Sequence, residues 1–240
     1  MKPVCRAFVI SALALLLASP LAISAQWSKK PYTEWSEKEA TKLLNESPWG
    51  RTDTFTDMSK SFSSGPGANP TARTTPSADS SVRNVHFRIR FLSARPVREA
   101  FARLIELRQK GAIPEQVAAR LKAFVVSGFN DFVVVTVDCE SEAKTEFQQI
   151  QALLNNRTTA DLKNSTYLQS GNNKVFLEEY QSPKSDGLGA RLVFPRLVDG
   201  KPWLTEASDE IHFYSELSTT YKLDMRYKVK EMMYQGKLEY

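Results

Sequence analysis

Cysteine and histidine are both scarce in this 240-residue sequence. It contains two cysteines, Cys5 and Cys139, and two histidines, His86 and His212. Cys5 lies in an N-terminal segment that we expect to be removed, so no disulfide could form within the remaining chain. A zinc site needs three or four ligands, usually at short spacing, and neither histidine has a second histidine or cysteine within a helical turn. We therefore expect no metal site.

Long apolar runs and phosphate-binding loops are also lacking. Beyond residue 25 there is no apolar run of the roughly 20 residues that a membrane-spanning helix needs, and the mean hydropathy is −0.37. The glycines of Asp186-Gly187-Leu188-Gly189 precede no predicted helix that could cradle a phosphate. Neighbouring acids such as Glu178-Glu179 point to opposite faces of a strand and cannot flank one bond. These absences predict no cofactor and favour a role without catalysis.

The first 25 residues have the parts of a secretory signal peptide. Lys2 and Arg6 precede an apolar stretch that ends at Ala18, and a run of small residues ends at Ala25. This order of a basic start, a short apolar centre and small residues is typical of cleaved signals. Cys5 lies before the apolar centre rather than at the cleavage point, which excludes a lipoprotein signal. We expect cleavage after Ala25 and a protein that is secreted or periplasmic.

Residues 26–58 are expected to form an N-terminal arm with one short helix. Ser36 and Glu39 have the spacing of a capping box, and Pro48 ends the pattern. The apolar positions form a narrow stripe of Ala40, Leu43 and Leu44. Such a stripe suits docking on a larger body, either the chain's own main domain, which we favour, or a partner.

Residues 59–81 are rich in Ser, Gly and Pro and predict a linker, so the main domain is expected over residues 82–240. Its expected elements are a strand at 85–91, two helices around 97–105 and 117–125, a buried strand at 132–137, a helix at 143–154, and strands at 175–180, 191–194, 211–214 and 222–230. The predicted class is α+β: an antiparallel sheet or sandwich in the C-terminal half, with a helical hairpin and one further helix packed on it, plus the N-terminal docking helix.

Basic residues concentrate in one segment. Residues 83–122 contain ten Lys or Arg and three Glu, although Lys and Arg exceed Asp and Glu by only five in the whole chain. This excess predicts either a solvated helical face or a surface for an anionic partner. The candidate binding residues are Arg88, Arg90, Arg95, Arg98, Arg103 and Arg108. Nucleic acid is not expected, because aromatic and basic residues do not interleave as a stacking platform requires.

Catalytic candidates are few. Cys139 follows a predicted buried strand, and with His86 or His212 brought beside it by folding it would be the minimum for a thiol nucleophile. A lone cysteine more often behaves as a small apolar residue, and no local signature of a thiol enzyme surrounds this one. Each histidine lies on the polar side of a predicted strand, where a solvated side chain is the ordinary outcome.

Three short segments carry a family resemblance. They are Tyr32–Ala40 with Leu43-Leu44 and Ser47-Pro48-Trp49, the central Phe194-Pro195-Arg196, and the ending Met233–Tyr240. Together they resemble a group of uncharacterised exported proteins found in acidobacteria. The resemblance implies a secreted or periplasmic bacterial protein. It implies no activity, cofactor or catalytic residue.

Three functions remain open on the sequence. The first is a non-catalytic binding or structural module of the cell envelope, whose partner is an anionic envelope component or another protein. The second is a secreted hydrolase or thiol enzyme with a site assembled from distant residues. The third is a peripheral binder of anionic membrane or polysaccharide through the basic segment 83–122.

Overall fold

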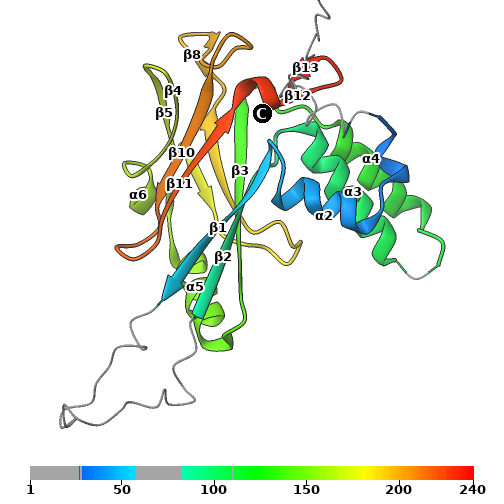
Figure 1. Cartoon of the computed structure of the whole chain (residues 1–240), viewed down its shortest axis with the longest axis horizontal. Coiled ribbons are helices and arrows are strands. Elements are labelled where there is room, and N and C mark those ends of the chain that lie inside the picture. The colour runs from blue at the N-terminus through cyan, green and yellow to red at the C-terminus, as the bar shows by residue number, and fades with distance from the viewer. Residues whose placement is uncertain (1–26, 28, 58–82, 110) are drawn as a thin grey trace, which may run out of the picture.

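The computed structural model describes Trp27 and residues 29–57, 83–109 and 111–240. The expected signal peptide and linker lie outside the described residues. The helices are α2 (Glu37–Asn45), α3 (Arg95–Arg108), α4 (Glu115–Val126), α5 (Lys144–Asn156) and α6 (Thr159–Leu162). Helices and antiparallel strands together confirm the α+β class, and α3 and α4 confirm the helical hairpin (Figure 1).

Nine strands form two antiparallel sheets. Sheet A has the order β1-β2-β3-β7-β6, and sheet B has the order β11-β10-β4-β5. Their bounds are β1 Gly50–Asp57, β2 Arg83–Phe91, β3 Phe132–Ser141, β4 Thr166–Ser170, β5 Asn173–Phe176, β6 Glu179–Gln181, β7 Ala190–Pro195, β10 Glu210–Glu216 and β11 Lys222–Lys228. Two short hairpins complete the described strands: β8 (Leu197–Val198) with β9 (Lys201–Pro202), and β12 (Met233–Tyr234) with β13 (Lys237–Leu238).

The core lies between the two sheets, which makes the fold a sandwich. Alternate residues of β2, from Val85 to Phe91, are buried as their spacing predicts. The ring of Phe91 meets that of Tyr227 from sheet B edge to face at 4.9 Å, and Phe194 meets Phe213 at 6.5 Å. These cross-sheet aromatic pairs hold sheets A and B together.

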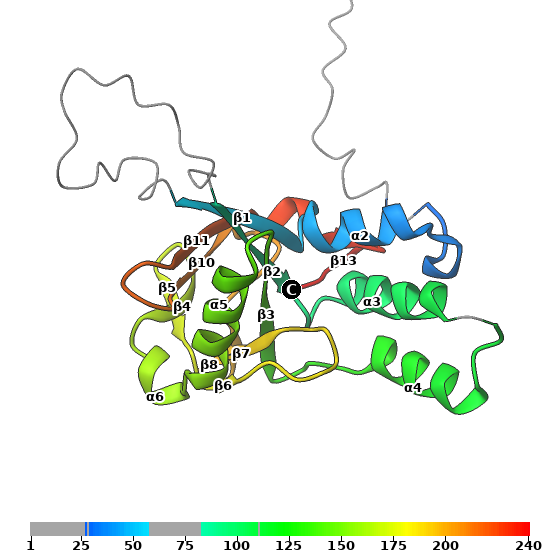
Figure 2. The same ribbon diagram turned by 90° about the horizontal axis from the view of Figure 1, so that it is seen from below.

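Helices cover both faces of sheet A. Helix α5 lies on the core side, where Tyr180 of β6 donates a hydrogen bond to the carbonyl of Leu154. Helices α2 and α3 pack together against the opposite face, near the end of β2, and the α3–α4 hairpin extends beside the sandwich (Figure 2). Sheet A therefore forms a middle layer between sheet B and the helices α2 and α3.

The N-terminal helix docks on its own chain. Ser36 and Glu39 form the expected capping box at the start of α2. Its whole apolar stripe, Ala40 with Leu43 and Leu44, is buried in the same continuous core as the two sheets. Trp49 is fully buried and donates its indole N–H to the carbonyl of Glu239 at 2.9 Å.

The N-terminal segment also supplies a strand that the sequence analysis did not predict. β1 is the edge of sheet A and pairs with β2 along its whole length. Its sequence, Gly-Arg-Thr-Asp-Thr-Phe-Thr-Asp, contains a single large apolar residue, Phe55, which packs edge to face on Phe87 at 5.5 Å. An edge strand buries few side chains, so its sequence need not alternate between apolar and polar residues, and that pattern does not identify it.

Other differences arise where strands change sheets. The segment 175–180, expected as one strand, divides into β5 of sheet B and β6 of sheet A. Val175 is buried in sheet B and Tyr180 in sheet A. Both ends of the segment therefore carry a buried apolar residue, and the sequence does not show that the strand is interrupted between them. A turn at Asp199-Gly200, with both residues at positive φ, joins β8 and β9, while β7 pairs with β3 and β6. β4 and α6 were not predicted.

The docking of α2 predicts a large loss of stability on truncation of its buried face. Leu43→Ala should lower the free energy of unfolding by about 2–5 kcal/mol, because it removes a fully buried leucine. Lys38→Ala on the exposed face of the same helix is the control and should change it by less than about 0.5 kcal/mol. Urea denaturation measures both values. Equal small losses for the two variants would contradict docking on the chain's own core.

Candidate anion-binding cavity

A cavity of about 260 Å³ lies where α2, α3 and the outer face of sheet A meet. Its apolar wall comes from α3, through Phe101, Leu104 and Ile105. Its charged wall comes from β2 and β3, through Arg88, Arg90 and Asp138, and the loop at Asp186-Gly187 borders it. The cavity thus combines an apolar side with a charged side.

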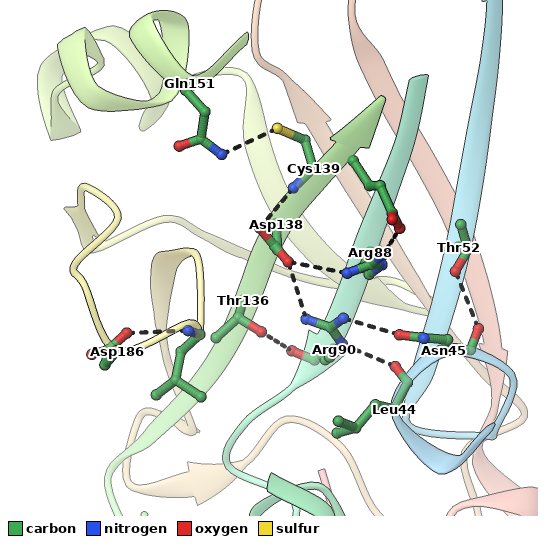
Figure 3. Close-up of polar contacts among 12 residues, drawn as sticks. Leu44, Asn45, Thr52, Arg88, Arg90, Thr136, Asp138, Cys139, Gln151 and Asp186 are labelled. Atoms are coloured by element: carbon green, nitrogen blue, oxygen red, sulfur yellow. Dashed lines mark hydrogen bonds and ion pairs between the residues drawn. The ribbon is translucent and has the colours of Figure 1, made fainter. Parts of the chain in front are cut away.

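Arg90 owes its buried position to the strand register. It lies opposite Gly50 of β1, and a Cβ on this glycine would stand 2.1 Å from the carbonyl oxygen of Leu44. The missing side chain lets the end of α2 approach the sheet. The Leu44 carbonyl can then accept a hydrogen bond from Arg90 Nε at 3.0 Å, and Asn45 Oδ1 accepts one from Nη2 at 2.9 Å. Figure 3 shows Arg90 between these acceptors and Asp138.

The third nitrogen of Arg90 has no hydrogen-bond partner among the described residues. Arg90 is only 3% exposed, and its Nη1 is completely buried. The nearest carboxylate oxygen, Oδ2 of Asp138, lies 3.9 Å away, beyond hydrogen-bond distance. Burial lowers the pKa of Arg90 to about 10, with Asp138 partly offsetting the effect, so the group stays charged at neutral pH. A buried cation with an unused donor favours an anion in the cavity.

Asp138 is shared between two arginines. Its Oδ2 is 3.6 Å from Arg88 Nη1 and 3.9 Å from Arg90 Nη1, while its Oδ1 accepts the backbone N–H of Cys139. Arg88 also forms an ion pair with Glu140. The long distances from Asp138 leave the Nη1 atoms of Arg88 and Arg90 without a close carboxylate.

The loop bordering the cavity is held against β3. Gly189 has φ +83°, and a Cβ there would stand 2.5 Å from the carbonyl oxygen of Val137. Any side chain at this position would force the loop away from the strand. Asp186 in the same loop forms an ion pair with Arg191 of β7. Both contacts fix the side of the cavity opposite α2.

The six predicted binding arginines divide into two groups. Arg88, Arg90 and Arg108 line the cavity, although Arg108 is exposed and lies 3.8 Å from Glu37. The others bond within the fold. Arg95 pairs with Glu99, and Arg103 donates to the carbonyl of Trp35.

Arg98 has a structural role. It is buried and donates to the backbone carbonyls of Leu92, Ser93 and Val125, which ties the start of α3 to the end of α4. Its guanidinium also lies over the ring of Phe129, 5.1 Å from the centroid. Burial lowers its pKa to about 10. Arg95, Arg98 and Arg103 therefore form contacts within the fold, and the basic segment does not form one continuous basic surface.

The structure does not bring Cys139 and a histidine together. Cys139 pairs with Phe87 across the sheet and shares its face, whereas the adjacent His86 points to the other face and contacts Thr54 Oγ1 at 2.9 Å. His212 lies in sheet B, where its Nε2 is 2.8 Å from Asp224. A thiol nucleophile with a histidine base finds no support in this arrangement.

Cys139 itself is deeply placed. It is 4% exposed, and its Sγ accepts a long contact of 3.4 Å from Gln151 Nε2 of α5. Burial, together with the charge of Asp138, raises the pKa of the thiol to about 11. Across the described ranges, no group of three or more His, Cys, Asp or Glu residues lies close enough to hold a metal ion. Nor does this part of the chain contain a helix that is long and apolar enough to cross a bilayer.

Sequence reasoning did not anticipate the cavity. Arg90 alternates with the apolar residues of β2 that face the core, and it is the approach of α2 over Gly50 and the ring of Phe101 from α3 that bury it. Asp138 and Asn45 were not candidates, because their relevance depends on contacts between segments far apart in the chain. The local excess of arginine was the one available signal, and it includes the strand that carries Arg88 and Arg90.

Comparisons with known proteins add little. No protein-family model matches the sequence, and neither does any curated protein. Among solved structures, similarity is found to a novel protein of unknown function from Burkholderia pseudomallei, at 14% identity and a TM-score of 0.40. The match covers 58% of this chain and 72% of that chain. A likeness this distant carries no argument about fold or function.

The position of Cys139 predicts an unreactive thiol. In a chain carrying Cys5→Ser, dithionitrobenzoate at pH 8 should leave Cys139 unmodified in the folded state, because the thiol is buried and its raised pKa of about 11 keeps it protonated. The same chain in guanidinium chloride is the control and should react fully. Rapid modification of the folded protein at pH 8 would show an accessible thiolate instead.

Proposed function

We propose that this chain is an exported, non-catalytic binding module of the cell envelope that holds an acidic group of its ligand in the cavity at Arg90. The observation that carries the proposal is the unused Nη1 of Arg90, buried at the cavity wall without a hydrogen-bond partner among the described residues. A carboxylate or phosphate oxygen is the acceptor that satisfies such a donor best.

The lining of the cavity narrows the class of ligand. Arg88 and Arg90 can both reach an anion near Asp138, while Phe101 and Ile105 offer an apolar wall. The volume of about 260 Å³ is just below the usual range for small-molecule sites. A compact acid with an apolar body, or an acidic end group of a larger envelope component, fits these properties.

The charged groups that line the cavity suit binding rather than catalysis. The cavity presents the guanidinium groups of Arg88, Arg90 and Arg108, which suit the binding of an anion through charge-assisted hydrogen bonds. Asp138 lies between two arginines, and its Oδ1 accepts the backbone N–H of Cys139, which fixes the position of the carboxylate. Binding is the function that this set of groups performs.

The support for export is separate and comes from the sequence. Lys2 and Arg6 followed by the apolar stretch ending at Ala18 form the signal pattern. The resemblance to exported acidobacterial proteins agrees with a secreted or periplasmic location. An envelope component with carboxylate or phosphate groups is then the ligand most available to the cavity.

The proposal predicts opposite effects from two substitutions beside Arg90. Isothermal titration calorimetry with benzoate as the probe should detect binding to the unmodified chain, and Arg88→Gln should weaken it tenfold or more by removing a charged donor. Asp138→Asn should strengthen it several-fold, because it removes the carboxylate that competes for Arg90.

Two controls distinguish the cavity from general charge effects. Arg120→Gln on the exposed face of α4 changes the net charge by the same amount as Arg88→Gln and should leave benzoate binding unchanged. Neutral benzamide should bind far more weakly than benzoate. The proposal is wrong if benzoate and inorganic phosphate both fail to bind, or if Asp138→Asn weakens binding as much as Arg88→Gln does.

A further inference from the structure

A second feature lies on the outer face of sheet B, away from the cavity. Tyr214, Tyr167 and Phe176 are direct cross-strand partners on β10, β4 and β5. Their neighbours Phe213, Leu168 and Val175 alternate into the core, so these rings face outward. The rings of Tyr167 and Tyr214 stack at 5.2 Å, and Tyr167 meets Phe176 at 6.0 Å. Phe176 remains 48% exposed.

The charges on this face are distributed unevenly. On the β10–β11 half they are paired across the strands: Glu210 with Arg226, Glu216 with Lys222 at 3.0 Å, and His212 with Asp224 at 2.8 Å. This half of the face is therefore electrically balanced by its own neighbours.

On the β4–β5 half, two lysines lack a carboxylate partner among the described residues. Lys174 Nζ lies 3.9 Å from the ring centre of Tyr167 and 5.9 Å from that of Phe176. Lys163 borders a shallow depression of about 360 Å³ together with Asn164, Phe176 and Leu177. Among the residues that the structure describes, no carboxylate lies within ion-pair distance of Lys163 or Lys174. The exposed ring of Phe176 thus has Lys174 near it and shares its depression with Lys163, and neither lysine has a carboxylate partner in the described structure.

We infer that this corner of sheet B binds an acidic polysaccharide. The apolar face of a sugar ring stacks on Phe176, and a carboxylate of the same or the next residue lies against Lys174 or Lys163. The depression beside Phe176 accommodates the ring, and Asn164 offers an amide to its hydroxyl groups. Rigid aromatic rings give a large contact area at little cost in side-chain entropy, while the two lysines without carboxylate partners select for negative charge.

The number of basic residues at this corner favours an acidic polysaccharide over an anionic membrane surface. Membrane surfaces are bound by clusters of about four to eight basic residues or by several apolar side chains that insert into the lipid. This corner has two free lysines and one strongly exposed ring. Two lysines and one exposed ring suit a polymer whose repeating units each carry one sugar ring and one acid group, rather than the continuous charge of a membrane surface.

The probe for this site is a hexamer of galacturonic acid, measured by calorimetry on the full chain. We expect binding that weakens as the salt concentration rises. Phe176→Ala and Lys174→Gln should each weaken it tenfold or more, and both positions are exposed enough for the variants to fold. Lys222→Gln is the matched control on the same face and should have no effect, because Lys222 is already paired with Glu216.

Further measurements distinguish this site from binding of neutral sugar, of a membrane surface, or of the acid in the Arg90 cavity. Methyl-esterified hexamer should bind much more weakly than the free acid. The inference is overturned by absence of binding to the acid hexamer, by equal binding in Phe176→Ala, or by tighter binding to phosphatidylglycerol vesicles than to the hexamer. Loss of hexamer binding in Arg88→Gln, with Phe176→Ala unaffected, would also overturn it and would assign the acid to the cavity.

Discussion

The guanidinium of Arg90 joins the N-terminal segment to the sandwich. Its Nε and Nη2 hold the end of α2 through the Leu44 carbonyl and the Asn45 side chain, and the absence of a side chain at Gly50 makes this approach possible. With α2 fixed there, α3 packs beside it, and both helices line the cavity to which Arg90 contributes. One buried arginine therefore organises both the architecture of this end of the molecule and its most distinctive chemistry.

Burying a guanidinium is costly unless its donors are satisfied, and the two buried arginines of the described residues meet this requirement differently. Arg98 donates through Nε and Nη1 to the carbonyls of Leu92, Ser93 and Val125. Arg90 has two nitrogens with hydrogen-bond acceptors, whereas its Nη1 is buried without a partner in the described structure, and its side chain lines the cavity. The contrast explains why a segment rich in arginine yields one candidate site rather than a uniformly basic surface.

Elements with strong local signals were predictable from the sequence. The capping box of Ser36 and Glu39, the alternation of β2 and the spacing of α3 and α4 each depend on neighbouring residues, and the structure confirms them. β1 escaped prediction because a Thr- and Asp-rich edge strand buries little. The division of residues 175–180 between two sheets, and the burial of Arg90, are set by packing between distant segments. Local patterns could therefore indicate the strand that bears the site but not the cavity itself.

The most direct measurement is a nitrogen-resolved NMR spectrum of the arginine side chains during titration with benzoate. If the unused nitrogen of Arg90 receives the acid, the Nε–H signal of Arg90 shifts in a saturable manner. The Nε–H signal of Arg98, which is also buried and whose Nε already donates to the carbonyl of Val125, then stays in place. An unchanged Arg90 signal at saturating benzoate, or equal shifts of both signals, would contradict the account.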